Sequence, residues 1–406
     1  MEKVCIVTSG FLPLPATKGG AVENLIENFI YSNEKNKKVD LEIFSVYDNS
    51  SKKESNKINN TKFNYIKINF LVRFFDLLIF YFAKYFLRKK NSHSYRFILQ
   101  RLYFYYLVSL KLKKGDYDKI VLENHFSQYL VLKWNKNYIK YKDKYYYHCH
   151  NDVSSFYGCK DIIENTRGFI CISEYIKDSL MNYLKLDGNK FFVLKNMIDN
   201  KKIFKISSIE ELNKYKLDLG LDDKDNIILF VGRLVPEKGI KELLSAMFKV
   251  DDTVKLIVVG NSIVGQKKCT SFELELKSMV EKLGNRVIFT GYVPYAELYK
   301  YYNLCDFTVL PSVWKEPAGL TIVESMIFGK PSITTRIGGI PEYTNDESAV
   351  LLDVDDLLID NLANSINDLI AHKEKLQIMS KCASDIYKDS NIDNYFDDFV
   401  DIISKG

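Results

Sequence analysis

Residues 316–324 read Glu-Pro-Ala-Gly-Leu-Thr-Ile-Val-Glu, and this stretch decides the expected fold. A short apolar run precedes it and predicts a buried strand, and the apolar residues of its second half repeat with helical spacing. Pro317 fits the first turn of a helix, so Glu316 is expected at the helix N-terminus, where free backbone N–H groups can hold an anion. Glu324 is expected about two turns further along, on roughly the same side. Two carboxylates beside an anion site fit a ligand with a phosphate and hydroxyl groups, such as a nucleotide-sugar.

Short apolar runs alternate with helical patterns along the 406 residues, which predicts parallel β-sheets covered by helices. A polar stretch at 199–225 indicates a linker, so we expect two domains of about 200 residues each. The polar stretch at 48–61 is expected to be a solvated loop. Ligands of open parallel sheets bind outside the carboxyl ends of the strands, so residues that follow a strand are the first candidates for a site. The expected strands are 4–8, 41–46, 65–68, 119–123, 145–149, 168–172, 191–194, 227–231, 255–259, 287–289, 307–310 and 332–334.

Two cations follow the expected strand at 227–231, in the loop Gly232-Arg-Leu-Val-Pro-Glu-Lys-Gly239. Arg233 and Lys238 on one loop suit a diphosphate that leaves with growing negative charge. The alternative is a surface loop whose cations are merely solvated.

A glycine pair, Gly19-Gly20, lies between the first expected strand and the first expected helix. Paired glycines let a backbone approach a phosphate or sugar closely, and the helix behind them presents its positive end. No Gly-x-Gly-x-x-Gly occurs, so a dinucleotide site is not expected. The alternative is a flexible turn.

Two histidines, His148 and His150, mark the end of the expected strand at 145–149. Being two residues apart, they are expected to point to opposite faces, so a shared metal is not expected. His150 is expected at the ligand edge, and His148 in the core or a wall. Glu123 and Asn124 close the expected strand at 119–123, a position that suggests ligand contact.

Three Asp-x-Asp triplets, at 116–118, 223–225 and 353–355, have the spacing of a metal-diphosphate site. The first precedes its strand and the others lie in acidic loops, so all three are interpreted as chance. The loop cations and the helix end can neutralise a diphosphate, and no metal is expected.

Together these elements resemble the signature of retaining GT-B glycosyltransferases of family 4, also called group 1. The resemblance covers nearly the whole chain and is strongest from 227 to 342. The residues that carry it are Asp306, Pro311-Ser312, Glu316-Pro-Ala-Gly-Leu-Thr321, Glu324-Ser-Met326, Gly329-Lys-Pro331, Gly338-Gly-Ile-Pro-Glu342 and the Gly232–Gly239 element.

The resemblance implies an α/β fold of the GT-B type, with two Rossmann-like domains facing across a cleft. Residues 1–200 would form the acceptor domain, 201–385 the nucleotide-sugar domain, and 386–406 a helix that crosses back to the first domain. The apolar pattern at 383–404 looks like that helix.

The resemblance also implies roles. Glu316 and the backbone of 318–320 would hold sugar hydroxyls, Thr321 the diphosphate, and Glu324 the ribose. The implied catalytic residues are His150, Arg233, Lys238 and Glu316. The implied donor-binding residues are Gly19, Gly20, Arg233, Lys238, Glu316, Ala318, Gly319, Leu320, Thr321 and Glu324, and the acceptor-binding residues are Glu123, Asn124 and His150. No residue matches a covalent nucleophile, which agrees with a front-face mechanism assisted by the leaving phosphate.

In particular, the chain is similar to bacterial lipopolysaccharide-core and surface-polysaccharide transferases. These are expected to move a hexose or N-acetylhexosamine from a UDP-sugar to a surface glycan, capsule or lipid-linked acceptor, without a cofactor. The alternatives are a nucleotide-sugar 2-epimerase of the same fold and a non-catalytic, membrane-associated binding subunit.

The net charge of +5 is unevenly distributed, because 71–114 holds ten Lys/Arg and a single acid, Asp76. Within the insertion 70–114, two aromatic helical stretches are expected at 70–86 and 95–112, and the first is too charged and too short to span a membrane. A basic aromatic helix can lie in an anionic headgroup layer, which makes an anionic membrane surface the expected partner. The alternative is that the aromatics pack on the domain. No nucleic-acid motif accompanies the basic residues, so no nucleic acid is expected.

The seven cysteines are irregularly spaced, which favours reduced thiols over a disulfide framework or a zinc site. The N-terminal residues pass directly into an expected strand, so no signal peptide is expected. Both features fit a cytoplasmic protein, peripheral on the inner face of the cell membrane.

Overall fold

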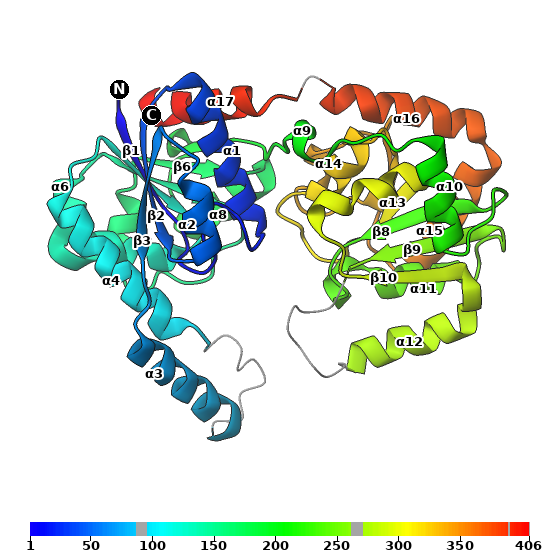
Figure 1. Ribbon diagram of the computed structural model, residues 1–406, viewed down its shortest axis with the longest axis horizontal. Coiled ribbons are helices and arrows are strands. Elements are labelled where there is room, and N and C mark those ends of the chain that lie inside the picture. Colours follow the sequence, from blue (N-terminus) through cyan, green and yellow to red (C-terminus); the bar gives the residue numbers. More distant parts are fainter. Residues whose placement is uncertain (87–95, 261–270, 389, 406) are drawn as a thin grey trace. The chain divides into compact units, whose positions relative to one another are not determined.

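A computed structural model describes residues 1–86, 96–260, 271–388 and 390–405 (Figure 1). The chain forms two compact units. Unit 1 comprises Met1–Met197 together with Ile392–Gly406, and unit 2 comprises Ile198–Asn391. The expected limits at 200 and 385 lie a few residues from these bounds.

Unit 1 is built on a seven-stranded, fully parallel sheet in the order β3-β2-β1-β4-β5-β6-β7. Its central strands are buried on both faces, which explains their continuous apolar runs. The strands are β1 (Lys3–Val7), β2 (Asp40–Val46), β3 (Thr61–Ile66), β4 (Lys119–Glu123), β5 (Tyr145–Cys149), β6 (Gly168–Cys171) and β7 (Phe191–Val193).

Helices surround this sheet, and the last of them returns to it from the end of the sequence. The ring of Phe29 on α1 stacks on Tyr395 and Phe399 of α17, with centroids 4.9 and 4.4 Å apart. The helices are α1 (Ala21–Asn36), α2 (Asn49–Ser55), α3 (Phe70–Tyr81), the π-helix η1 (Phe82–Phe86), α4 (Ile98–Lys114), η3 (Phe126–Tyr129), α5 (Leu130–Lys133), η4 (Trp134–Lys136), α6 (Asn137–Lys140), α7 (Lys160–Glu164), α8 (Glu174–Leu184), η5 (Gly188–Lys190) and α17 (Ile392–Lys405).

Unit 2 has a six-stranded parallel sheet in the order β10-β9-β8-β11-β12-β13. Its strands are β8 (Asn226–Val231), β9 (Val254–Val259), β10 (Val287–Gly291), β11 (Phe307–Leu310), β12 (Ser332–Thr335) and β13 (Ala349–Leu352). Its helices are α9 (Asn200–Ile203), α10 (Ile209–Asp218), η6 (Pro236–Lys238), α11 (Ile240–Met247), α12 (Ser271–Leu283), η7 (Gly284–Arg286), η8 (Tyr295–Glu297), α13 (Tyr299–Leu304), α14 (Leu320–Ile327), η9 (Ile340–Glu342), α15 (Leu358–Ala371) and α16 (Lys373–Tyr387).

The predicted fold class is confirmed in both sheets, and four local predictions are wrong. The expected solvated loop at 48–61 contains α2, because the Asp48 side chain caps the helix by accepting from the N–H of Ser50 and Ser51. Strand β3 begins at Thr61, earlier than expected, and β13 was not expected. The pattern at 383–404 is divided between α16 and α17, in different units.

Among the described residues, no helix is both long enough and apolar enough to cross a membrane. Five of the described cysteines are buried, Cys382 is half-buried, and all six are free thiols. The seventh, Cys269, lies outside the described residues.

Candidate active site

In unit 2, a charged pair joins two loops that follow neighbouring strands. Lys238, after β8, places its Nζ 2.6 Å from Glu316 Oε1, after β11. The Ser312 hydroxyl also lies 2.6 Å from this oxygen. Glu316 retains 16% side-chain exposure and Lys238 27%, so both can still reach a ligand. The loops thus bring together at the carboxyl edge of the sheet two residues that are 78 positions apart in the sequence.

Glycines make this close approach of loops possible. Gly239 has φ +69°, and a Cβ there would lie 1.8 Å from the Pro311 carbonyl oxygen. Gly338 has φ +59°, and its Cβ would lie 2.3 Å from the Glu316 carbonyl oxygen, to which Gly339 N–H also donates at 2.7 Å. Any side chain at either glycine would force the loops that carry Lys238 and Glu316 apart.

The helix beside this pair starts later than expected. Helix α14 begins at Leu320 and not at Pro317, so the expectation that Glu316 stands at the helix N-terminus is wrong by one turn. Gly319 precedes the helix and has no side chain, so it provides no cap for the first N–H groups of α14, which include that of Thr321. Ala318 and Gly319 form the link between Glu316 and this helix end.

Glu324, inside α14, is buried and accepts a hydrogen bond from the Tyr302 hydroxyl at 2.9 Å. Burial raises the pKa of its carboxyl to about 7, against which the hydrogen bonds of Tyr302 and Tyr295 act. Glu324 therefore changes charge near neutral pH.

The second loop cation, Arg233, is exposed. Among residues 1–86, 96–260, 271–388 and 390–405, none forms an ion pair with its guanidinium. Of the two predicted cations, one is therefore held by a carboxylate and the other is available to an anion from solution.

In unit 1, the glycine pair precedes α1 in a conformation that favours glycine. Gly19 has φ +72° and Gly20 has φ +111°. A Cβ at Gly20 would lie 2.2 Å from Glu23 Oε2, so this carboxylate fills the space that a side chain would need. The loop therefore presents bare backbone at the start of α1, as expected.

The two histidines and Glu123 form one buried cluster, which we call the Glu-His-His cluster. Glu123 Oε2 lies 3.2 Å from His148 Nδ1 and 3.0 Å from His150 Nε2, and the two rings lie 4.1 Å apart. The prediction that the histidines point to opposite faces is wrong, because residues i and i+2 of a strand share a face. The ligand atoms of the three residues lie within 4.8 Å of one another, so this cluster of described residues could hold a metal ion. The opposite orientation of the histidines therefore no longer supports the expected absence of a metal, and that absence stays a prediction.

The charges of the cluster are set by burial and by mutual contact. Burial raises the pKa of Glu123, but the charges and hydrogen bonds of His148 and His150 outweigh it and lower the pKa to about 2. Burial, and after it the charge of His148, lower the pKa of His150 to about 4, although the hydrogen bond and charge of Glu123 act in the opposite direction. Glu123 is thus ionised and His150 neutral near pH 7.

Glu23 is the neighbour that the sequence did not single out. Burial raises the pKa of its carboxyl, and repulsion from Glu123 adds to this shift. The cluster and the glycine loop are therefore linked by the charge on two carboxylates. A Glu in the first turn of a helix does not by itself indicate a functional site, because such a Glu ordinarily stabilises the helix by interacting with its dipole.

Asn124, the other predicted acceptor residue, has a left-handed backbone with φ +74°. Its Oδ1 accepts from Asn151 Nδ2 at 2.8 Å, and its N–H donates to the His148 carbonyl at 2.9 Å. Asn124 thus ties the loop after β4 to the end of β5, next to His150.

The Asp-x-Asp triplets belong neither to the Lys238–Glu316 pair nor to the Glu-His-His cluster. Asp118 precedes β4 and accepts from Lys3 N–H at 2.9 Å, as expected for a structural residue. Asp353 directly follows β13, a strand that was not expected from the sequence. It lies at the edge strand of the sheet, away from the loops after β8 and β11.

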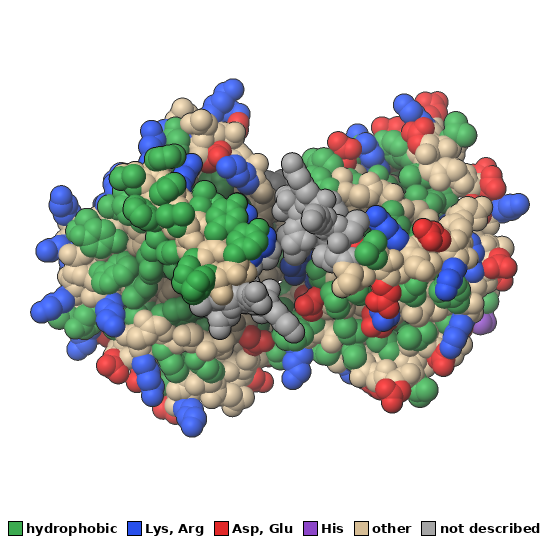
Figure 2. Space-filling model, turned by 90° about the horizontal axis from the view of Figure 1, so that it is seen from below, with side chains coloured by type: hydrophobic (Ala, Val, Ile, Leu, Met, Phe, Trp, Pro, Cys, Tyr) green, Lys and Arg blue, Asp and Glu red, His purple; other side chains and the backbone are tan. Residues whose placement is uncertain are grey.

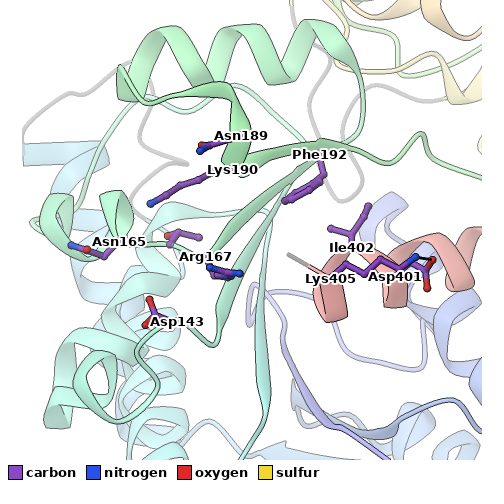
Figure 3. Close-up of a pocket in the computed structure, with 10 residues that line it drawn as sticks. Asp143, Asn165, Arg167, Asn189, Lys190, Phe192, Asp401, Ile402 and Lys405 are labelled. Atoms are coloured by element: carbon purple, nitrogen blue, oxygen red, sulfur yellow. Dashed lines mark hydrogen bonds and ion pairs between the residues drawn. The ribbon is translucent and has the colours of Figure 1, made fainter.

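One pocket of unit 1 lies at the opposite edge of the sheet, before the amino ends of β5, β6 and β7 (Figure 3). Asp143, Arg167, Lys190 and Lys405 are among its lining residues. None of the predicted site residues lines it. Ligands of open parallel sheets bind at the carboxyl edge, so we assign this pocket no role in the site.

Comparisons with known proteins agree with this architecture. Residues 213–385 match the family model described as "Glycosyl transferases group 1". The chain is 26% identical over 180 residues to the lipopolysaccharide 1,2-N-acetylglucosaminetransferase of Salmonella typhimurium, and the aligned part covers 43% of this chain and 47% of that protein. It is 24% identical to the putative glycosyltransferase YtcC of Bacillus subtilis, over 94% of this chain and 86% of YtcC.

Among solved structures, Anabaena Alr3699/HepE in complex with UDP-glucose superposes with a TM-score of 0.71 at 19% identity. The superposition covers 100% of both chains, which shows the shared fold. The chain spans about half the length of the Salmonella transferase that it matches.

Proposed function

We propose that this protein is a retaining glycosyltransferase. The match of residues 213–385 to the glycosyl transferases group 1 model and the likeness of the fold to that of Alr3699/HepE support this proposal. The donor is a UDP-sugar, UDP-N-acetylglucosamine or a UDP-hexose. The acceptor is a bacterial surface glycan or a lipid-linked precursor. The N-acetylglucosamine transfer by the Salmonella relative and the UDP-glucose bound by Alr3699/HepE support this choice.

The observation that carries the proposal is the Lys238–Glu316 pair beside the exposed Arg233. A diphosphate needs cations that follow the charge as it grows on the leaving phosphate, and Lys238 and Arg233 provide two on one loop. Glu316 can accept hydrogen bonds from sugar hydroxyls while it orients Lys238. Thr321 and the uncapped start of α14 add N–H donors for the phosphates, and Glu324 accepts from the ribose.

On the acceptor side, His150 is proposed to contact the reacting sugar. Its Nε2 points to Glu123, so its Nδ1 is the atom that can accept a hydrogen bond from a hydroxyl. No residue is assigned as a covalent nucleophile; the leaving phosphate helps to deprotonate the acceptor on the same face of the sugar. The loop cations and the helix end take the place of a metal ion.

The basic segment in unit 1 is proposed to hold the protein on the cytoplasmic face of the membrane. In the described parts, 71–86 and 96–114, seven Lys/Arg accompany Asp76, which is buried. Arg88, Lys89 and Lys90 of the same segment lie outside the described residues. A cationic, aromatic surface without exposed acids fits an anionic leaflet.

A donor panel tests the proposal. Purified protein is incubated with UDP- and GDP-sugars and with total lipid and oligosaccharide extracts, and nucleotide release is measured. We expect acceptor-dependent release of UDP from one donor, with retained anomeric configuration in the product. Release of free, epimerised sugar without acceptor would indicate the 2-epimerase alternative, and no turnover with any donor would indicate a binding subunit.

A further inference from the structure

Helix α3 and the π-helix η1 expose an unusual amount of apolar surface. In 70–86, only Asp76, Phe80 and Ala83 are buried. Figure 2 shows the resulting hydrophobic patch on unit 1. The large exposed side chains are Phe70, Leu71, Phe74, Phe75, Leu77, Leu78, Tyr81, Phe82, Tyr85 and Phe86. A contiguous patch of this kind marks a binding surface.

This surface is held in a defined position by the one acid of the segment. The buried Asp76 carboxylate accepts from the N–H of Phe97 at 2.7 Å, from that of Leu99 at 2.8 Å, and from Gln100 Nε2 at 2.9 Å. Asp76 therefore caps the start of α4 and fixes α3 against it. The exposed apolar side chains are thus carried by a fixed element, so their exposure is a property of the fold.

A groove runs along the contact between α3 and α4. Eight side chains line it, and none of them carries a charge. They are Leu71, Val72, Phe75, Leu99, Leu102, Tyr103, Tyr106 and Trp134. A lining of this kind offers a ligand almost only apolar contact, which suits a hydrocarbon chain.

The groove lies on elements that reach the ligand edge of the sheet. Phe97, at the start of α4, packs edge-on against Phe11, with ring centroids 5.3 Å apart. The Tyr105 hydroxyl donates to the Ser9 carbonyl at 3.1 Å. Ser9 and Phe11 follow the carboxyl end of β1 and lead toward the glycine pair. A ligand in the groove would therefore have its polar end near the acceptor side of the proposed site.

The charge around the groove distinguishes between two possible ligands, a second copy of this chain and an amphiphile with an anionic headgroup. Arg73 on α3, Lys84 on η1 and Arg96, which precedes α4, are exposed, while Asp76 is buried. A second copy of this chain would bring like charges together, which is unfavourable. An amphiphile with an anionic headgroup meets apolar contacts and cations at once.

We propose that the α3–α4 groove binds a hydrocarbon chain of the acceptor, so that the acceptor is a lipid with an anionic headgroup and not a free glycan. This inference rests on the proposed function for the identity of the ligand as acceptor. The groove itself requires only lipid binding, which can be measured without any turnover.

Trp134 is a built-in reporter, because it lines the groove and the chain has only one other tryptophan, Trp314 in unit 2. In a Trp314→Phe background, a short-chain phosphatidylglycerol brominated on its acyl chain is added below its critical micelle concentration. Bromine quenches a tryptophan that it touches. We expect saturable quenching of Trp134.

Two matched variants on α3 test the location. Leu71 lines the groove and is 58% exposed, whereas Leu77 does not line it and is 43% exposed. Leu71→Glu should weaken the monomer binding about tenfold or more, because it places a charge in an apolar contact, and Leu77→Glu should change it by less than about twofold. Both substitutions stand at exposed positions, so folding is preserved in each.

Quenching by brominated vesicles alone, without quenching by monomers, would overturn the groove and leave a membrane-docking face. An equal loss of monomer affinity in Leu71→Glu and Leu77→Glu would also overturn the assignment of the groove as the binding site. If monomers bind as expected and the donor panel shows no transfer, the lipid site stands and the proposed enzymatic function fails. If transfer succeeds and monomers do not bind, the acceptor is a soluble glycan.

Discussion

The candidate site residues of unit 1 and those of unit 2 are arranged in opposite ways. In unit 2, Lys238 and Glu316 lie after strands β8 and β11, stay partly exposed, and form a charged pair. In unit 1, the charged groups are buried, and Glu123 Oε2 contacts both His148 and His150. A site of the first kind is assembled from local motifs, whereas a site of the second kind exists only when neighbouring strands are in register.

Their carboxylates also differ in charge. The pKa of Glu123 is lowered to about 2, chiefly by the two histidines acting against burial. The pKa of Glu324 is raised to about 7 by burial. Both carboxyls are buried, so their hydrogen-bonding partners decide in which direction the pKa shifts. The partners of Glu123 are imidazoles, which can carry a positive charge, whereas those of Glu324 are neutral tyrosine hydroxyls.

The largest expected effect is on the charged pair. Glu316→Gln and Lys238→Ala should each lower turnover by about 100-fold or more, because each removes a group aimed at the sugar or the leaving phosphate. Lys241→Ala is the control, since Lys241 pairs with Glu275 at 2.7 Å on the surface of the same unit. Steady-state UDP release measures all three. Near wild-type turnover in either pair variant would remove the donor-site assignment.

The Glu-His-His cluster should affect stability more than its small size suggests. Glu123→Gln leaves a buried imidazole N–H without a charged acceptor, which should cost about 1–3 kcal/mol in urea unfolding of unit 1. Glu23→Gln is the matched control, because it removes a carboxylate that Glu123 repels and should be neutral or stabilising.

The same cluster should make unit 1 sensitive to acid. His150 has a folded pKa of about 4, below its unfolded value of 6.5, so only the unfolded chain takes up a proton between these values. Stability is therefore present above about pH 6.5 and is lost as the pH falls toward 4. A unit 1 transition that is independent of pH in this window contradicts the assignment.

Glu324 should respond to pH in the opposite direction. Its folded pKa of about 7 exceeds the ordinary value of 4.5, so its contribution to stability is present below pH 4.5 and is lost as the pH rises through 7. If only the carboxylate binds ribose, UDP affinity should rise up to about tenfold from pH 6 to 8. Calorimetry with Glu324→Gln should show a weaker affinity without this rise.

The smallest expected effect is that of metal removal, because the loop cations are proposed to neutralise the diphosphate. Turnover after dialysis against EDTA should equal that of untreated protein. Activity lost and then restored by Mg²⁺ or Mn²⁺ would point to the triplet at 353–355. Restoration by Zn²⁺ alone would point to Glu123, His148 and His150, whose ligand atoms are close enough for an ion.

The same contrast explains what the sequence could predict. The fold class and the loops of unit 2 could be predicted, because apolar periodicity and the spacing of Arg233, Lys238 and Glu316 are local signals. The start of α14 was predicted one turn early, since Pro317 satisfies the rule for a first turn equally well as part of a preceding loop.

The Glu-His-His cluster could be predicted only in part. The two-residue spacing of His148 and His150 should have placed both on one face of β5. Their partner Glu123 lies on β4, and the pairing of β4 with β5 follows from the sheet order, which no local pattern gives. The roles of Glu23 and Asp76 depend on contacts across elements and had no signal of their own.

The return of α17 to unit 1 has a consequence for the order in which the protein matures during synthesis. Phe396 and Phe399 belong to the core of unit 1, and Asp393 accepts from the Ser32 hydroxyl at 2.7 Å. A ribosome makes these residues only after all of unit 2. Unit 2 can therefore complete its core first, while unit 1 waits with the α1 side of its core uncovered. A nascent chain stalled before residue 392 should expose that surface to chaperones.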